Sequence, residues 1–571
     1  MTLFQNPFPV PHIPDDLTIP QFMLREPSQL PRARNIPWFI NDKTGRSYCF
    51  EEVHHRTFGL ANALSIKWSI AKDDVVCLFS PNHVDYANVV WAVHTLGGII
   101  SPANPGYTPD ELVHQLTTAK AKLLVTHPVS LKTALAAAKA AGLPNSSILV
   151  LEKAHNLPNL PTLDELIDFG ASLPSNYSAV RLRPGESKTT IAFLCFSSGT
   201  TGKPKAVIIP HYSIIANTIQ TTAHFHLLDP QWPNKRFLPG DVILGVLPFF
   251  HIYGLVVIMH FTLYCGASIV AVPKFNFEEF LSSIHRFKAT HLFVVPPQVV
   301  LLCKHPAAKN RVFDHVKMVV SGAAPLSGDL MQQVTKIFPN ASIGQGFGMT
   351  ESAATVSFIQ ADKKIGTIGS AGGLIPGIIA KVVKADGSLG KEGEQGELVI
   401  KGPANALGYL NNPKATAETF VDGWLRTGDE VIIKDNEIFV VDRLKEIMKV
   451  RGFQVAPAEL EGHLLLHPDV KDACVVGIPD DYSGEIPLAY VVPSDAAQKE
   501  IQKGPAGARK IQKEIEKHVS DNKVRYKWLA GGVVFIDTVP KNPSGKILRR
   551  HLRDQARAER ASRAKLVEAK L

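Results

Sequence analysis

Two glycine-rich stretches carry the residue types that a phosphate-bearing ligand needs. The first, Ser197-Ser-Gly-Thr-Thr-Gly-Lys-Pro-Lys205, follows the apolar run Ile191–Phe196 and combines two glycines, several hydroxyls and two lysines. Glycine lets backbone N–H groups approach a phosphate closely, hydroxyls donate hydrogen bonds, and lysine supplies charge. The stretch is not a Walker A loop, because Pro204 stands after the lysine where Ser or Thr is required. It predicts a polyphosphate loop at the end of a strand, although a flexible surface turn has a similar composition.

The second stretch is Gly344-Gln-Gly-Phe-Gly-Met-Thr-Glu-Ser352. It does not match the dinucleotide fingerprint, because Met349 stands where the last glycine is required. Thr350 suits a phosphate donor and Glu351 suits a Mg²⁺ ligand, since Mg²⁺ prefers one or two carboxylates together with phosphate oxygens. The alternative is a Thr–Glu pair that caps a helix.

Four further stretches are weaker taken one at a time. Small residues in Ser321-Gly-Ala-Ala-Pro-Leu326 leave room for a planar ring at the end of a strand, where α/β proteins bind ligands. Asp429 follows a Thr-Gly turn and could accept hydrogen bonds from ribose hydroxyls. Lys546 follows a Pro-Ser-Gly turn, and its charge could stabilise a pentacovalent phosphate. Pro248–Gly254 is an aromatic cluster with one histidine, a pattern that is more often core than catalytic.

In this order along the chain, the motifs resemble those of the adenylate-forming superfamily, specifically the 4-coumarate–CoA ligase and acyl-CoA synthetase branch, with luciferases as cousins. The resemblance extends from about Val53 to Lys546. It implies an acid–CoA ligase that uses ATP, Mg²⁺ and coenzyme A. A carboxylic acid would attack the α-phosphate of ATP to give acyl-AMP and pyrophosphate. Coenzyme A would then displace AMP to give the thioester.

The resemblance also implies roles for individual residues. The catalytic residues would be Lys546, His251 and Lys449, and the metal ligand would be Glu351. The acid would contact Tyr253, Val257 and Phe358. ATP and coenzyme A would be bound by Ser197, Ser198, Gly199, Thr200, Thr201, Gly202, Lys203, Lys205, Ala323, Gln345, Gly346, Thr350, Asp429, Arg443, Gln454, Lys274, Arg451 and Gly452.

Three positions depart from the family pattern, and a fourth is its hinge. Arg451 stands where many relatives carry lysine, and Ala206 where glycine is common. Val257 stands where coumarate ligases tend to carry a small polar residue, which favours an apolar aromatic ring or an alkyl chain in the acid over a hydroxylated cinnamate. By resemblance, Lys445 is the hinge about which the C-terminal part turns between the two reaction steps.

The elements that must position these residues follow an alternating pattern. Short β-branched runs alternate with helical stretches, which predicts α/β layers with largely parallel sheets. After residue 387 the pattern changes to shorter, turn-rich strands, and after residue 442 a compact unit follows. We expect a large N-terminal adenylation domain (1–442) of layered, mostly parallel sheets with helices and a small distorted barrel. A small mobile α+β domain (443–571) follows it. The expected strands are Val75–Ser80, Leu123–Thr126, Ile148–Leu151, Ile191–Phe196, His291–Val295 and Met318–Val320, and the expected C-terminal helices are Pro457–Leu466 and Arg509–Lys523.

Composition excludes several classes of protein. The chain has 571 residues, 45% of them hydrophobic and 20% charged, which excludes general disorder. Of the net charge of +9, residues 544–571 carry +6, since nine Lys or Arg face three Asp or Glu there. The basic charge therefore belongs to a C-terminal tail that we expect to be solvated. The remainder is close to neutral, which argues against a nucleic-acid binder. Residues 242–273 contain no Asp, Glu, Lys or Arg, yet their broken pattern favours a buried strand–helix–strand passage over a membrane span.

Six widely spaced cysteines indicate free thiols in a reducing compartment. The terminal Ala569-Lys-Leu571 resembles the Ser-Lys-Leu peroxisomal address, which implies a peroxisomal import receptor as a partner and, without it, a cytoplasmic location. Two other readings stay open. One is an acyl-AMP-forming enzyme that loads a carrier protein or acts as a luciferase. The other is a non-catalytic acyl-binding peroxisomal protein.

Overall fold

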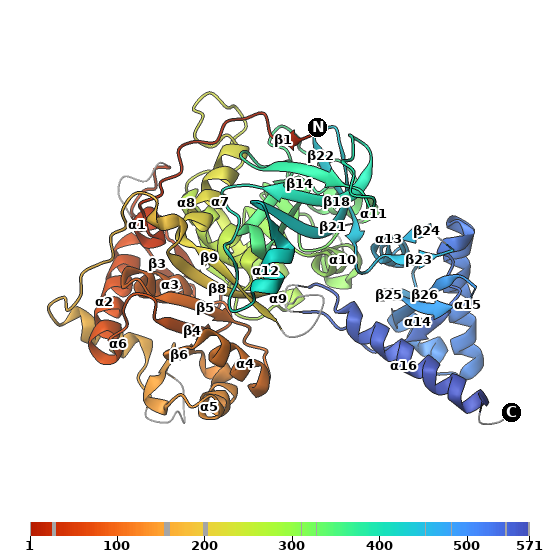
Figure 1. Cartoon of the computed structure of the whole chain (residues 1–571), viewed down its shortest axis with the longest axis horizontal. Helices are drawn as coiled ribbons and strands as arrows, with labels where there is room; N and C mark the ends of the chain where they lie inside the picture. The colour runs from red at the N-terminus through yellow and green to blue at the C-terminus, as the bar shows by residue number, and fades with distance from the viewer. Residues whose placement is uncertain are drawn as a thin grey trace.

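The computed structural model describes residues 2–24, 30–153, 160–197, 204–309, 311–326, 328–451, 453–480, 482–542 and 545–568, with backbone alone for 561–568. Figure 1 shows a large body formed by most of the chain and a smaller body at its C-terminal end, along which the last helix runs. The confirmed architecture is α/β, with a large domain of sheets and helices followed by a smaller C-terminal domain.

The first sheet of the large domain is made of buried, β-branched strands. Its order is β19-β9-β8-β5-β4-β6-β7, in which β5, β4, β6 and β7 lie parallel and β8 continues them. All residues of β4 and β5 are buried, because helices cover both faces of a parallel sheet. The strands are β4 (Val75–Phe79), β5 (Ile99–Ala103), β6 (Leu123–Thr126), β7 (Ile148–Val150), β8 (Ile191–Ser197), β9 (Lys205–Pro210) and β19 (Gly408–Tyr409).

The second sheet has a parallel half and an antiparallel half. The parallel half contains β2 (Phe39–Asn41), β11 (Ser268–Ala271), β10 (Val242–Gly245), β12 (His291–Val294), β13 (Met318–Ser321) and β14 (Ser342–Met349). From β14 the sheet continues antiparallel through β15 (Ala354–Phe358), β16 (Gly373–Leu374), β22 (Glu437–Arg443), β21 (Trp424–Lys434), β18 (Gln395–Lys401), β17 (Ile379–Val383) and β1 (Phe4–Gln5), with β3 (Ser47–Tyr48) and β20 (Phe420–Val421) at the edges. The small barrel was expected in the part of the chain that forms this antiparallel half. Its strands are hydrogen-bonded into the same sheet as the parallel strands.

Helices cover these sheets. In the large domain they are α1 (Ile19–Leu24), α2 (Phe50–Trp68), α3 (Tyr86–Thr95), α4 (Pro109–Ala119), α5 (Leu131–Ala140), α6 (Leu163–Ala171), α7 (His211–His224), α8 (Thr262–Tyr264), α9 (Phe277–Arg286), α10 (Pro296–Lys304), α11 (Gly328–Ile337) and α12 (Pro413–Thr419). Residues 242–271 form a strand, a π-helix (Tyr253–Phe261), α8 and a strand, which confirms the buried passage predicted there. Within the described residues, no helix is both long and apolar enough to span a bilayer.

The C-terminal domain is built on a sheet of its own. Its order is β24-β23-β26-β25, with β27 beside β26, from β23 (Met448–Val450), β24 (Phe453–Val455), β25 (Val470–Asp480), β26 (Gly484–Pro493) and β27 (Val533–Phe535). Its helices are α13 (Pro457–Leu464), α14 (Asp495–Ile501), α15 (Pro505–Asn522) and α16 (Arg549–Glu568). The boundary between residues 442 and 443 stays a prediction; β22 ends at Arg443.

The basic C-terminal segment was expected as a tail, and the structure shows a helix of 20 residues, α16, packed on β25. Leu552 and Ala556 are buried in a cluster with Cys474 and Tyr490. Ala, Arg and Lys are strong helix formers, so this stretch forms a helix despite its charge, and the helix is anchored by its few apolar residues.

Candidate active site

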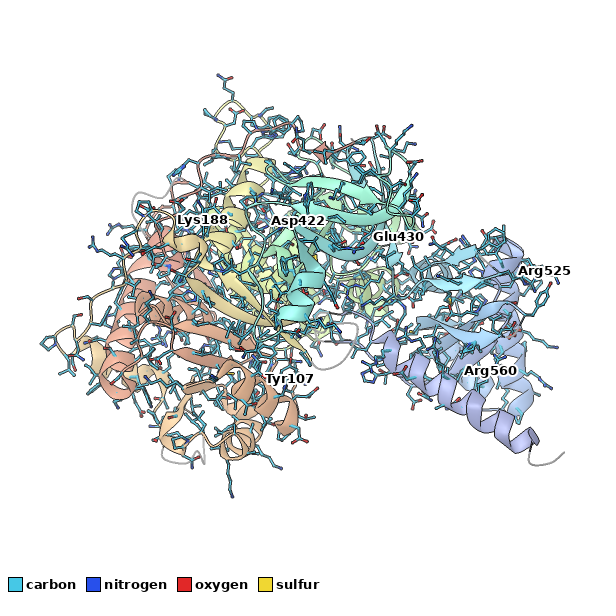
Figure 2. All side chains as sticks on the ribbon, viewed as in Figure 1. Tyr107, Lys188, Asp422, Glu430, Arg525 and Arg560 are labelled. Carbon is cyan, nitrogen blue, oxygen red and sulfur yellow. The ribbon has the colours of Figure 1, made fainter. Side chains whose placement is uncertain are left out.

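A cavity of about 1220 Å³ lies between the two domains. Residues from β14, β21 and β22 line it on the large-domain side, and residues from α13 and the loop before α16 line it on the other. In Figure 2, Glu430 marks β21, and Arg525 and Arg560 mark the C-terminal domain to its right. Of the predicted site residues, the cavity brings together Ala323, Gln345, Gly346, Asp429, Arg443 and Lys546.

The carboxylate of Glu351 is held by two donors. It lies in the 3₁₀ turn after β14, with the residue only 8% exposed. Its Oε1 accepts hydrogen bonds from the Ser197 hydroxyl at 3.2 Å and from the Tyr409 hydroxyl at 2.9 Å. The Lys205 ammonium lies 4.9 Å from the centre of the Tyr409 ring. The end of β8, where the phosphate loop begins, and the Thr350–Glu351 turn are therefore neighbours.

Two residues shape the wall next to this turn. Gln345 is buried, its Oε1 accepts the Leu326 N–H at 2.7 Å, and its Nε2 donates to the Ser370 carbonyl at 3.2 Å. It thus ties β14 to the turn after β13. In that turn Ala323 has a φ of +69°, a conformation that costs energy for any residue with a side chain. Backbone strain at this point is consistent with a functional constraint on the turn.

Asp429 and Arg443 face each other on neighbouring strands. They are register partners on β21 and β22, and Arg443 Nε lies 3.3 Å from Asp429 Oδ1. Asp429 is buried, and burial raises its pKa, while the nearby Arg443 and Lys546 charges act in the opposite direction. The two cations favour the charged form of Asp429, while burial favours the protonated form and has the larger effect.

Lys546 enters the cavity from the C-terminal domain. Its backbone N–H donates to the Asn542 side chain at 2.8 Å, which fixes the turn that carries it. Burial, together with the Arg443 charge, lowers the pKa of Lys546 to about 8, against the opposing effect of Asp429 and Glu446. Burial lowers the pKa of His251 to about 4, and the Lys546 charge contributes to this shift. Lys546 and His251 are therefore electrostatic neighbours although almost 300 residues separate them.

The predicted acid-binding residues lie beside the π-helix. Tyr253 is its first residue, and a side-chain carbon on Gly322 would come within 2.9 Å of the Tyr253 ring. The buried Tyr253 hydroxyl has no hydrogen-bond partner among the described residues. Val257 is buried one turn further along the helix. Phe358 packs against Phe225 at a ring distance of 5.1 Å, in the core behind Gly346.

Other predicted residues are not brought to the cavity. Lys449 and Gln454 are exposed register partners in the β23–β24 hairpin, and Arg451 lies in its turn with a φ of +53°. The Arg451 guanidinium lies 5.0 Å from the centre of the Tyr482 ring. Lys274 is exposed after β11. Ser198, Gly199, Thr200, Thr201, Gly202, Lys203, Gly452 and the terminal Ala569-Lys570-Leu571 lie outside the described residues.

Two positioning residues were missed by sequence reasoning. Tyr409 holds Glu351, as described above. Asn82, which follows β4, donates from Nδ2 to the Gly245 and Leu247 carbonyls, both at 2.9 Å, and accepts the Phe249 N–H at 2.7 Å. It fixes the loop that leads to His251. No local pattern in the sequence identifies either residue. For Asn82, the one indication is that an amide follows a buried strand, since a buried amide must find hydrogen-bond partners.

The charge of Lys546 predicts a pH profile. Because the pKa is lowered to about 8, the ammonium is present below this pH and is lost as the pH rises through it. If the charge assists phosphoryl chemistry, kcat/KM for ATP should fall about tenfold per pH unit above pH 8, since kcat/KM reports the free enzyme. Measuring the profile of pyrophosphate release from pH 6 to 10 tests this. Lys546→Arg keeps the charge and should remove the descending limb; a wild-type profile that stays flat to pH 10 would contradict the prediction.

Fold and site together define a two-domain enzyme with its centre between the domains, and comparison with known proteins identifies its family. The sequence profile of the AMP-binding enzyme family matches residues 27–410, and that of the AMP-binding enzyme C-terminal domain matches residues 459–546. An acyl-CoA ligase, AFT1-1, of Alternaria alternata is 36% identical over 97% of this chain and 98% of its own length. A 4-coumarate–CoA ligase of Pinus taeda is 34% identical over 98% of each chain. The chain belongs to the AMP-binding enzyme family, in the branch that contains these ligases.

Solved structures share the fold. The anthranilate CoA ligase AuaEII in complex with anthranoyl-AMP superposes with a TM-score of 0.81, at 23% identity, over 96% of this chain and 99% of that one. A benzoate CoA ligase from Burkholderia xenovorans LB400 gives a TM-score of 0.78, at 23% identity, over 94% and 100%. The expected fold class is thereby confirmed.

Proposed function

We propose that the chain is an ATP-dependent acid–CoA ligase, which forms an acyl-AMP and then an acyl-CoA thioester. The proposal rests mainly on one observation. Lys546 from the small domain lines the same interdomain cavity as Asp429 and Arg443 from the large domain. Relatives of full length named acyl-CoA ligase and 4-coumarate–CoA ligase support the assignment.

Each described group has a place in the first step. The oxygens of Asp429 face the cavity and suit the ribose hydroxyls, while Arg443 and Lys546 supply positive charge for the phosphates. The charge of Lys546 acts on His251 and that of Asp429 acts on Lys546, so the Lys546 ammonium would contact both the α-phosphate and the incoming carboxylate. Charge placed in a partly buried site stabilises developing negative charge more strongly than it would in water. His251 is neutral at pH 7 because its pKa is about 4, so it can line the acid site without adding charge.

Glu351 fits the Mg²⁺ that such a reaction requires. Among the described residues, both of its hydrogen bonds reach Oε1, which leaves Oε2 for an ion. No group of three His, Cys, Asp or Glu side chains in the described part of the chain could hold a metal. Mg²⁺ would therefore be bound by Glu351 together with nucleotide oxygens, as Mg²⁺ sites commonly are. When bound, the ion would neutralise phosphate charge; Tyr409 and Ser197 orient its carboxylate ligand.

The acid is proposed to be apolar, either an aromatic ring or an alkyl chain. The buried side chain of Val257 and the ring of Tyr253 against Gly322 make an apolar wall. The Tyr253 hydroxyl, which has no partner among the described residues, adds one hydrogen-bonding point to this wall, and the pairs of acids in the test below show whether a ring hydroxyl uses it.

The test is pyrophosphate release over a panel of cinnamates, phenylacetate, benzoates and medium to long fatty acids, with and without coenzyme A. Each aromatic acid is paired with its ring-hydroxylated form, and Tyr253→Phe is compared with the wild type on both. Release that coenzyme A accelerates, with a thioester product, is the expected result. Release indifferent to coenzyme A would instead assign a carrier-loading or luciferase-like enzyme. Absence of release with every acid would contradict the proposed activity.

We propose further that Ala569-Lys-Leu571 directs import into peroxisomes when it forms the C-terminus of the chain. The support is the resemblance of the tripeptide to a known peroxisomal address. A fluorescent protein that carries residues 549–571 at its end should enter peroxisomes, and the same fusion without the last three residues should stay in the cytosol. Identical distributions of the two fusions would refute the proposal.

A further inference from the structure

Helix α13 of the C-terminal domain is contacted at its first turn by an acid of the large-domain sheet. The N–H of Ala458, the second residue of α13, donates to Asp442 Oδ2 at 3.0 Å. Asp442 lies on β22, where it pairs in register with Glu430 of β21. It is 6% exposed, and no side chain of α13 itself caps this end of the helix. The carboxylate of Asp442 thus replaces the missing cap.

The other end of α13 is contacted by a cation of the large domain. Lys304, the last residue of α10, donates to the carbonyl of Leu465, the residue that ends α13, and to the carbonyl of Val470 at 3.4 Å. Partial burial lowers the pKa of Lys304 from its usual value. The ammonium therefore lies at the Leu465 carbonyl, at the end of the helix where carbonyl groups lack intrahelical partners, and also contacts the first residue of β25.

These two charges match the dipole of α13. A helix carries partial positive charge at its N-terminus and partial negative charge at its C-terminus, so an acid at the first end and a base at the second both stabilise it. Neither charge belongs to the C-terminal domain's own core, which is formed around residues such as Leu460, Ile511 and Val491. Their contribution is therefore available in the present orientation of the domain and is lost when α13 moves away.

Helix α10 also reaches the loop of Lys546. A side-chain carbon on Gly545 would lie 2.9 Å from Val295 Cγ2 and 3.8 Å from Pro297 Cδ, so the backbone beside Lys546 packs on the first turn of α10. The nine residues of α10 span about 13 Å. Helix α10 thus contacts α13 through Lys304, the last residue of α10. It contacts the Lys546 loop through the first turn of α10.

We propose that Asp442 and Lys304 hold α13 by its two ends and so keep the C-terminal domain in the orientation that places Lys546 in the cavity. They are positioning residues for acyl-AMP formation and act through α13 and α10. The inference rests on the proposed ligase function, and it goes beyond that function because it identifies what selects between two orientations of the domain.

The test compares the two half-reactions in Lys304→Met, which keeps the length of the side chain and removes its charge. Acyl-AMP formation is measured by ATP–pyrophosphate exchange, and thioester formation by the reaction of supplied acyl-AMP with coenzyme A. Loss of one charge at a helix terminus should lower the exchange rate about three- to tenfold. The thioester rate should stay unchanged or rise. Asp442→Asn, which retains an acceptor oxygen, should act in the same direction with a smaller change.

Lys336→Met is the matched control, because Lys336 is an exposed lysine on the neighbouring helix α11 and does not line the cavity. It should leave both rates unchanged. Equal loss of both rates in Lys304→Met would indicate a general structural role. No loss in either rate would show that the Lys304 contact does not contribute to the reaction. Either outcome overturns the proposal.

A measurement without catalysis separates this inference from the proposed function. Spin labels at Glu278 and Lys499, both exposed and one on each domain, report the interdomain distance once the two partly exposed cysteines, Cys49 and Cys303, are replaced. The wild type should show a distribution dominated by one distance, and Lys304→Met should broaden it or add a second distance. An unchanged distribution would refute the role of Lys304 even if the chain proved to catalyse a different reaction.

Discussion

Lys546→Ala should lower the rate of acyl-AMP formation about 100- to 1,000-fold, the usual cost of removing one preorganised group that stabilises transition-state charge. The reason is that Lys546 lines the same cavity as Asp429 and Arg443, where the α-phosphate and the carboxylate would meet. The reaction of supplied acyl-AMP with coenzyme A should change little. ATP–pyrophosphate exchange and single-turnover thioester formation, measured on the same preparation, test the two statements separately.

The matched control is Lys541→Met in the same loop. Lys541 Nζ is bonded to Asp472 Oδ2 at 2.6 Å within the C-terminal domain, so its loss removes an equal charge without emptying the catalytic position. It should leave exchange within about twofold of the wild type, since a partly exposed ion pair contributes little. Equal loss in the two variants would mean that the loop, and not the Lys546 ammonium, supports the reaction.

Gly254→Ala should destabilise the large domain by about 2–3 kcal/mol, the cost of overpacking, and should abolish acid binding. A side-chain carbon at this position would lie 2.0 Å from the Pro248 carbonyl oxygen and 3.1 Å from the Leu247 oxygen, so the backbone itself must move. That backbone includes the acceptor of the His251 N–H and the loop that Asn82 fixes. Denaturant unfolding followed by intrinsic fluorescence, together with acid binding by calorimetry, measures the two effects.

Gly106→Ala serves as the comparison, because a side-chain carbon there would meet a single neighbour, Asn104 Oδ1, at 3.3 Å. Its unfolding midpoint and acid affinity should match the wild type. A wild-type midpoint for Gly254→Ala would show that the turn before the π-helix is looser than the structure describes.

The sequence predicted those parts of the fold that local patterns determine. The strands expected at Leu123–Thr126 and Ile148–Leu151 agree with β6 and β7 to within one residue, because buried parallel strands are short, continuous apolar runs bounded by turn residues. The motif residues Gln345 and Asp429 lie inside β14 and β21, two strands that both line the cavity. These positions follow from motifs that lie close together along the chain.

Long-range contacts were not predictable in the same way. Tyr409 reaches Glu351 across 58 positions and Asn82 reaches Phe249 across 167, and no local periodicity encodes such pairs. The orientation of the β23–β24 hairpin depends on how a whole domain docks, and that docking includes long-range contacts such as those of Lys304. Helix α16 was missed because its charge suggested a solvated tail, while two buried side chains are enough to hold it.

The β23–β24 hairpin and Lys546 belong to the same small domain, built around β26, and the structure places Lys546 in the cavity while Lys449 and Gln454 of the hairpin lie exposed outside it. A cycle that needs both would include two reorientations of that body through water for every product released. The rate of these domain motions depends on the viscosity of the solvent. When they limit turnover, kcat should decrease as sucrose or glycerol raises the viscosity, although the chemical barriers stay the same. The architecture would limit how fast such an enzyme can operate, however reactive its acid.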